Sequence, residues 1–204
     1  MPASGWALLW RARAEMDIRI EKTGLDGLEL VHQQIAGDAR GYFREIYRDD
    51  VFRPFGVGMT VVQINKSRSA KNVVRGLHFQ WDKPLAKMMR VTLGRAFLVG
   101  VDIRKSSPTL GKWFGRVFDE GEYCQLYGDP GFARGFCALT DFAEIEYLCT
   151  ATYNPHGESG IRWDDPEIGV QWPLDGPPTL SAKDRDAQTL REWLARPEAD
   201  SFRL

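Results

Sequence analysis

The stretch KMMRVTLGRAFLVGVDIR, residues 87–104, has the side-chain pattern of two consecutive β-strands. Apolar residues recur at every second position on both sides of its centre, in VTL (91–93) and in FLVGV (97–101). This period is typical of strands, whose successive side chains point to opposite faces of a sheet. Gly94 interrupts the run between a leucine and an arginine. We therefore expect two strands joined as a β-hairpin.

Short runs rich in Val, Ile, Phe, Tyr and Thr extend this pattern in both directions, separated by glycine and proline. The further candidate strands are GLELVHQQIA (27–36), GMTVVQINKSR (58–68), NVVRGLHFQ (72–80), WFGRVFD (113–119), YCQLY (123–127), GFCALT (135–140) and AEIEYLCTATYN (143–154). Helical periodicity is confined to residues 185–195, where Leu190, Trp193 and Leu194 share one face. The sequence predicts an all-β jelly roll, a cupin-like double-stranded β-helix, with a short C-terminal helix.

Length and composition indicate one globular domain. The chain has 204 residues, of which 43% are hydrophobic and 27% charged, and a domain of this size has one core. We expect residues 1–15 to be a disordered N-terminal extension and residues 16–204 to be the domain. The net charge of −1 argues against nucleic-acid binding, and no apolar run approaches the roughly 20 residues of a membrane span.

The three cysteines are Cys124, Cys137 and Cys149. They are too few and too widely spaced for a disulfide framework or a zinc ribbon. We expect buried free thiols in a protein of the reducing cytoplasm.

Only three histidines occur, His32, His78 and His156, and His78 lies within the predicted strand NVVRGLHFQ. Strict alternation places His78 and Gln80 on one face and Arg75, Leu77 and Phe79 on the other. A lone strand histidine is more often structural than catalytic. Metal-binding barrels of this kind use two histidines two residues apart, and here Gln80 occupies the second position, so we expect no metal.

Four cations could suit a nucleoside diphosphate, which arginine forks and lysine point charges bind. They are Arg40, Arg75, Lys87 and Lys183. Scattered surface charges explain the same spacing equally well. Four nearby aromatic residues could stack on a base or a sugar, or belong to the core: Tyr42, Phe43, Tyr147 and Tyr153.

Seven segments, taken in order, form a more specific pattern. They are GDARGYFRE (37–45), QINKSRSAKNVVRGLHFQ (63–80), VDIRKSSPTLGKW (101–113), GFARGF (131–136), AEIEY (143–147), ESGIRWDDPEIGVQWP (158–173) and LSAKD (180–184). Together they closely resemble the dTDP-4-dehydrorhamnose 3,5-epimerase family, from about residue 16 to residue 190.

The resemblance implies an isomerase that inverts C3 and C5 of a nucleotide-linked 4-keto-6-deoxyhexose without a cofactor. It also implies a homodimer in which N-terminal strands cross to the partner. By position, His78 is similar to the family's general base, Asp184 to its orienting carboxylate and Tyr147 to its proton donor. The positions that match substrate-pocket residues are Arg40, Glu45, Gln63, Asn65, Arg75, Lys87, Tyr153, Glu158 and Lys183.

The chemistry explains these residue types. A proton next to a ketone is acidic enough for imidazole only if the enolate is stabilised, and Lys87 is the candidate cation for the C4 oxygen. A carboxylate such as Asp184 fixes the histidine tautomer and favours the imidazolium. Inversion also requires a donor on the opposite sugar face, which Tyr147 would supply.

One motif departs from the family pattern, because GFARGF has Arg134 where the family has a pocket histidine. A permanent cation replaces a neutral partner there, and it could hold the diphosphate or stabilise the enolate. The change leaves two variant functions open, a C3-only epimerase and an epimerase of a different nucleotide sugar. A non-catalytic sugar-nucleotide-binding protein is the alternative from another class.

Overall fold

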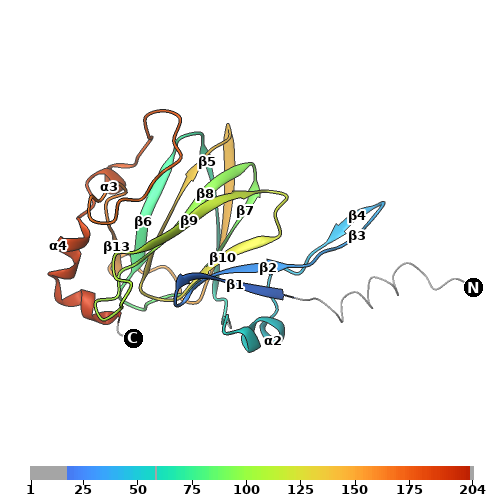
Figure 1. Ribbon diagram of the computed structural model, residues 1–204, viewed down its shortest axis with the longest axis horizontal. Coiled ribbons are helices and arrows are strands. Elements are labelled where there is room, and N and C mark those ends of the chain that lie inside the picture. The colour runs from blue at the N-terminus through green and yellow to red at the C-terminus, as the bar shows by residue number, and fades with distance from the viewer. Residues whose placement is uncertain (1–17, 58, 203–204) are drawn as a thin grey trace, which may run out of the picture.

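Two antiparallel sheets face each other in the computed structural model, which describes residues 18–57 and 59–202 (Figure 1). In spatial order, the six-stranded sheet contains β1 (Ile18–Leu25), β2 (Leu28–Gln33), β10 (Cys124–Gly128), β7 (Lys87–Leu93), β12 (Phe142–Cys149) and β5 (Gln63–Ala70). The five-stranded sheet contains β13 (Glu158–Gly160), β6 (Val74–Gln80), β11 (Phe132–Ala138), β8 (Arg95–Asp102) and β9 (Trp113–Asp119). The predicted all-β jelly roll is confirmed. The predicted extension, residues 1–15, lies outside the described residues.

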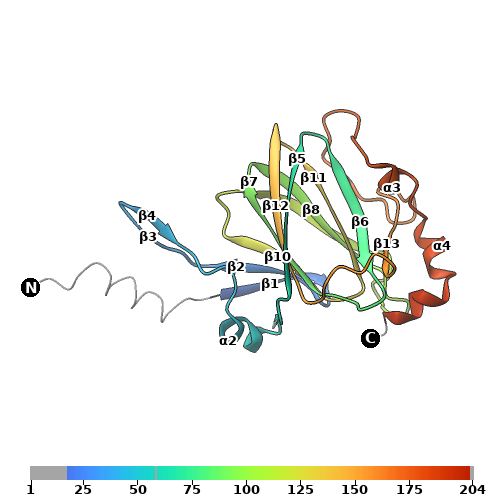
Figure 2. The same cartoon turned by 180° about the vertical axis from the view of Figure 1, so that it is seen from behind.

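The remaining elements lie outside this sandwich. A small hairpin of β3 (Ala36–Asp38) and β4 (Gly41–Phe43) projects away from it, as Figure 2 shows. Short helical turns follow the hairpin, and others form the C-terminal segment: α2 (Asp49–Phe52), η2 (Arg53–Phe55), α3 (Ala182–Arg185), α4 (Leu190–Leu194) and η3 (Pro197–Ser201). No helix among the described residues is long and apolar enough to cross a membrane.

The predicted hairpin in residues 87–104 is wrong, although both of its strands exist. β7 pairs with β10 and β12, whereas β8 pairs with β11 and β9. The chain crosses from one sheet to the other at Gly94, whose φ of +70° suits glycine and where a Cβ would lie 2.3 Å from the carbonyl oxygen of Phe142. Alternation shows that two strands meet at a break, but it does not identify their partners.

The predicted short C-terminal helix is confirmed as α4, with narrower bounds than residues 185–195. A further short helix, α3, precedes it, because residues 181–195 contain two N-cap residues. Ser181 accepts a hydrogen bond from the backbone N–H of Asp184, and Thr189 forms a capping box with Glu192. The apolar face is confirmed in part, since Leu190 and Trp193 are buried.

The C-terminal segment covers the outer face of the five-stranded sheet. Trp193 is fully buried there against Phe79, with ring centroids 4.5 Å apart, and Leu77 belongs to the same cluster. A second cluster, which includes Leu30, Leu98 and Phe136, fills the space between the sheets. The three cysteines are buried free thiols, as predicted.

A β-bulge in β6 changes the predicted facing of Arg75. His78 pairs with Arg134 and Arg75 pairs with Phe136, so three steps along β6 match two along β11. Residues two apart on β11 share a face, and therefore Arg75 and His78 face the barrel interior together. The strict alternation that grouped Arg75 with the outward Leu77 is wrong at this point.

Gly76 makes this bulge possible. Its φ is +133°, and a Cβ there would lie 2.6 Å from the Cα of Gly135 and 3.0 Å from the carbonyl oxygen of Arg134. No side chain fits between the two strands without moving backbone.

We predict that Gly76→Ala lowers the free energy of unfolding by about 2–6 kcal/mol, the sum of backbone strain and overpacking. Gly24→Ala is the matched control, because Gly24 also has a positive φ, +89°, but no atom lies within 4 Å of the added Cβ. The control should lose only the strain, about 1–3 kcal/mol. Urea denaturation followed by tryptophan fluorescence measures both. Equal losses in the two variants would contradict a tight contact at Gly76.

Candidate functional site

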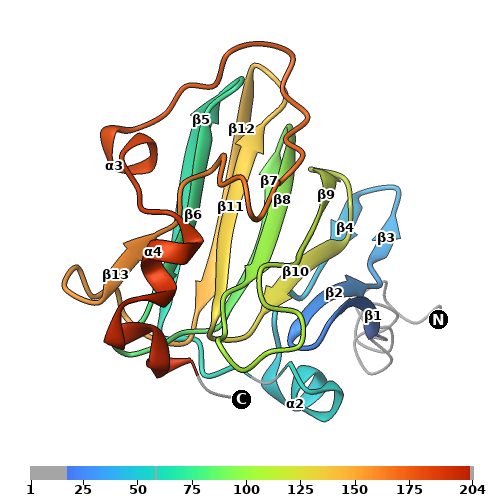
Figure 3. The ribbon, with the colours of Figure 1, turned by 60° about the vertical axis from the view of Figure 1, so that its left-hand side comes forward.

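His78 and Asp184 form a hydrogen-bonded pair at the inner face of β6. His78 Nε2 lies 2.5 Å from Asp184 Oδ1, and Asp184 comes from α3, which packs beside β6 (Figure 3). Burial by itself raises the pKa of Asp184, but hydrogen bonds from His78 and Ser181 outweigh it and lower that pKa. The ionised carboxylate therefore accepts a hydrogen bond from the Nε2–H of His78, which leaves Nδ1 as the basic ring nitrogen.

Tyr147 lies on the opposite wall, because β12 belongs to the six-stranded sheet. Its hydroxyl donates to Ser67 Oγ at 2.5 Å, and Arg75 Nε donates to Ser69 Oγ at 3.1 Å. Burial raises the pKa of Tyr147, so the phenol keeps its proton at neutral pH. The interior thus has a basic imidazole on one sheet and a protonated phenol on the other.

A small cavity lies at this end of the barrel. Its lining includes five predicted pocket residues: Gln63, Asn65, Lys87, Tyr153 and Glu158. Several of their polar groups pair with one another, since Gln63 Nε2 donates to Asn65 Oδ1 at 2.9 Å and the backbone N–H of Tyr153 donates to Gln63 Oε1 at 2.8 Å. The cavity wall is therefore polar, and hydrogen bonds hold several of its groups.

Glu158 joins two further predicted residues to this wall. Its Oε2 accepts from Tyr153 Oη at 2.8 Å and pairs with Lys183 Nζ at 2.5 Å. Burial tends to raise the pKa of Glu158, but the bonds from Lys183 and Tyr153 lower it overall. Glu158 is thus an ionised acceptor at the cavity edge.

Lys87 is a half-buried cation of the cavity floor. In the sheet it lies opposite Gly128 of β10 and Cys149 of β12. Burial, followed by the positive charge of Arg134, lowers the pKa of Lys87.

Arg134 lies beside this floor and is only 5% exposed. Its Nη1 donates to the carbonyl oxygen of Phe132 at 2.9 Å, and its Nη2 donates to the carbonyl oxygens of Asp129, at 2.6 Å, and Gly128. Both terminal nitrogens are therefore engaged by the turn between β10 and β11.

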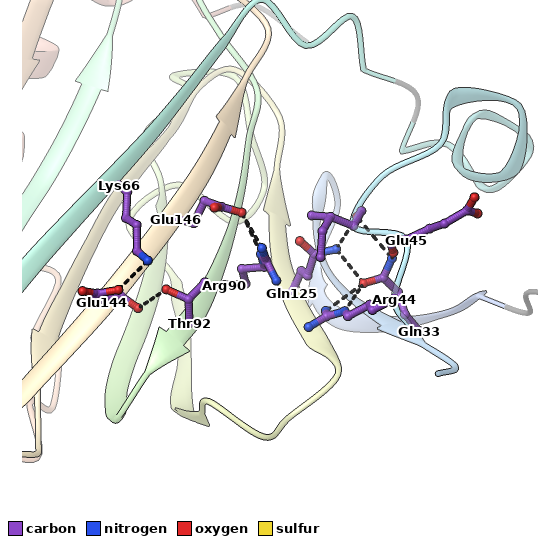
Figure 4. A network of polar contacts seen from close by, with 10 residues as sticks. Gln33, Arg44, Glu45, Lys66, Arg90, Thr92, Gln125, Glu144 and Glu146 are labelled. Atoms are coloured by element: carbon purple, nitrogen blue, oxygen red, sulfur yellow. Dashed lines mark hydrogen bonds and ion pairs between the residues drawn. The ribbon is translucent and has the colours of Figure 1, made fainter. Parts of the chain in front are cut away.

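Arg40 and Glu45 lie outside the cavity of their own chain. Arg40 is in the projecting hairpin and pairs with Asp38 at 2.5 Å. Glu45 pairs with Arg48 at 3.1 Å, near a polar network on the outside of the six-stranded sheet (Figure 4). The structure thus brings eleven of the thirteen predicted site residues around one end of the barrel: His78, Tyr147, Asp184, Gln63, Asn65, Arg75, Lys87, Arg134, Tyr153, Glu158 and Lys183.

Sequence reasoning missed three polar residues of the site, Ser67, Gln80 and Cys149. Gln80 and Cys149 line the cavity, and Ser67 Oγ accepts a hydrogen bond from the Tyr147 hydroxyl. The two-residue period of a strand could have identified two of them. Gln80 follows His78 by two residues and Cys149 follows Tyr147 by two, so each shares a sheet face with a predicted site residue. In the described part of the chain, no three His, Cys, Asp or Glu side chains gather as a metal-binding group.

Known proteins are similar to this chain in sequence and in fold. A sequence model of the family dTDP-4-dehydrorhamnose 3,5-epimerase matches residues 22–192. The dTDP-4-dehydrorhamnose 3,5-epimerase of Methanothermobacter thermautotrophicus is 44% identical over 179 residues, which are 86% of this chain and 96% of that protein. The dTDP-4-dehydrorhamnose 3-epimerase of Streptomyces niveus is 37% identical, over 86% of this chain and 85% of its own.

A solved structure is similar to this chain in both sequence and fold. It is a dTDP-6-deoxy-D-glucose-3,5-epimerase from Legionella pneumophila in complex with dTDP-4-keto-L-rhamnose. It is 37% identical and superposes with a TM-score of 0.85, covering 90% of this chain and 97% of its own. By the family match, the relatives and the fold, this chain belongs to the dTDP-4-dehydrorhamnose 3,5-epimerase family.

Proposed function

We propose that this chain inverts C3 and C5 of dTDP-4-dehydro-6-deoxy-D-glucose to give dTDP-4-dehydro-L-rhamnose. The observation that carries the proposal is the hydrogen-bonded pair of His78 and Asp184 at the five-stranded sheet, with Tyr147 on the facing six-stranded sheet. A protein that only binds a sugar nucleotide needs neither a base with its orienting carboxylate nor a facing acid. The dTDP-sugar in the related Legionella structure supports the substrate class.

The steps follow from the charges in the cavity. His78 takes the proton from a carbon next to the C4 ketone, and the electron pair of that C–H bond moves to the C4 oxygen. The cation of Lys87 stabilises the resulting enolate. Tyr147 then returns a proton from the opposite face of the sugar, which inverts the carbon. Once His78 has released its proton to solvent and Tyr147 has taken one up, the same sequence at the other carbon next to the ketone completes the double epimerisation.

Deuterium exchange tests the reaction directly. In deuterated water, incubation with dTDP-4-dehydro-6-deoxy-D-glucose should place deuterium at both C3 and C5, because solvent-derived protons replace the two that are removed. NMR of the product reads both positions. Retention of both original protons by folded protein would refute epimerisation.

A C3-only epimerase is the second candidate, favoured by the 37% identity to the Streptomyces niveus 3-epimerase. The same assay separates the two, since label at C3 alone would select this function. Turnover confined to a CDP- or GDP-linked sugar would instead select a different nucleotide specificity.

The role of His78 gives a second prediction. His78→Ala should lower the exchange rate by about 100-fold to 10,000-fold, the usual contribution of a general base. His156→Ala is the control, because His156 is exposed. Both variants should show the wild-type circular dichroism spectrum. Exchange at the wild-type rate in His78→Ala would remove the catalytic assignment.

A homodimer would explain why Arg40 and Glu45 lie away from the cavity of their own chain. The projecting hairpin carries Arg40 and exposed aromatic residues, including Tyr42 at 64% exposure, and the outer face of β5 exposes Ile64 at 62%. We infer that the hairpin crosses to a second copy and brings these residues to its cavity.

The buried free thiols support the cytoplasmic location predicted from the sequence.

Mixing two inactive variants tests this arrangement. Arg40→Ala should lose about tenfold or more in kcat/KM if it binds the diphosphate. Refolding it together with His78→Ala should restore about a quarter of wild-type activity, because mixed dimers contain one intact site. Light scattering should show a dimer. A monomer at micromolar concentration, or no gain on mixing, would contradict the crossed hairpin.

A further inference from the structure

Arg134 reaches across the barrel to the floor that carries Lys87. Its Cα lies opposite His78 in the five-stranded sheet, whereas Gly128 and Lys87 are paired in the six-stranded sheet. A Cβ on Gly128 would lie 3.1 Å from Arg134 Nε and 3.2 Å from Arg134 Nη2. The guanidinium therefore occupies the space that the missing Gly128 side chain leaves, directly beside Lys87.

The charge of this guanidinium is not neutralised by an ion pair. Among the described residues its hydrogen-bond acceptors are three backbone carbonyls, those of Gly128, Asp129 and Phe132, and no carboxylate lies within ion-pair distance. Arg134 Nε is buried without a partner in the same part of the chain. Carbonyl dipoles satisfy donors but leave the net charge in place. Burial lowers the pKa of Arg134 to about 10, so the guanidinium is charged at neutral pH.

The charge of Arg134 and charged groups on other elements act on the pKa of Lys87. Burial is the largest influence and lowers the pKa of Lys87, and Arg134 on β11 lowers it further. Lys183 on α3 acts in the same direction, whereas Cys149 on β12 and Glu158 on β13 act in the opposite one. Two cations thus share one side of the cavity floor.

We propose that Arg134 is a positioning residue that acts through Lys87, holding a second positive charge behind the ammonium that faces the substrate ketone. The inference rests on the proposed epimerase function and deepens it. Negative charge develops on the C4 oxygen only when the enolate forms, so a fixed charge behind Lys87 stabilises the transition state more than bound substrate. It also makes the Lys87 ammonium a better proton donor to that oxygen.

The pH dependence of kcat tests the proposal. Arg134→Met removes the charge but keeps an unbranched apolar side chain. It should lower kcat by about tenfold, less than the 100-fold to 1,000-fold that loss of a direct oxyanion donor costs, with little change in KM. Without the repulsion, Lys87 should lose its proton at higher pH, so the alkaline limb should move up by about 1 pH unit.

Arg134→Lys and Arg116→Met are the matched variants. Arg134→Lys keeps the charge and should retain the wild-type alkaline limb, which a purely packing role would not predict. Arg116 is another arginine whose Nε is buried without a hydrogen-bond partner, but its Nη2 pairs with Glu122, its guanidinium packs over Phe118 and its charge acts on Cys124. Arg116→Met should leave the alkaline limb where it is.

A titration of Lys87 by ¹³C NMR, assigned with Lys87→Arg, keeps the test independent of activity. The Lys87 resonance should titrate about 1 pH unit higher in Arg134→Met than in the wild type or Arg134→Lys. An unchanged titration in folded Arg134→Met would overturn the proposal. If Arg134→Met does not fold, Arg134→His is measured instead, since neutral imidazole should give the same upward shift. A shifted titration in a protein without deuterium exchange would instead count against the epimerase function alone.

Discussion

The close contact between β6 and β11 is the constraint on which the site depends. At Gly76 and Gly135 the two backbones approach so closely that a Cβ on either residue would meet the other strand within 3 Å. This contact permits the bulge, and the bulge places Arg75 and His78 on one inner face. An ordinary strand would direct one of the two side chains outward, into the apolar layer under Trp193. The packing of the β6 and β11 backbones thus determines where the side chains of the site lie.

Around that strand the environment differs between the two groups that we propose to transfer protons. The hydrogen bond to Asp184 gives His78 a defined tautomer, while burial keeps the phenol of Tyr147 protonated. The proposed base and acid therefore lie on facing sheets. Burial and a neighbouring arginine act against the charge of Lys87, so this lysine favours a ligand that brings negative charge.

The sequence predicted the class of fold and most of the site, because both depend on local patterns. Alternation located the strands, and ordered motifs located His78, Tyr147 and Asp184. It could not predict that β7 and β8 separate at Gly94, since strand partners depend on contacts between distant segments. Nor did strict alternation foresee the bulge, because the reason for it lies on β11. The two caps at Ser181 and Thr189 were visible in the sequence and would have corrected the helix bounds.

The crossing at Gly94 also affects how the chain reaches this structure. Within the two main sheets, only β1 with β2 and β8 with β9 are neighbours both in sequence and in space. Every other pairing joins segments separated by further strands or long connections, so much loop-closure entropy is lost before the contacts form. Such a topology folds slowly, in milliseconds to seconds, compared with helical bundles. Neither sheet has enough local pairing to form first, and the two must assemble together.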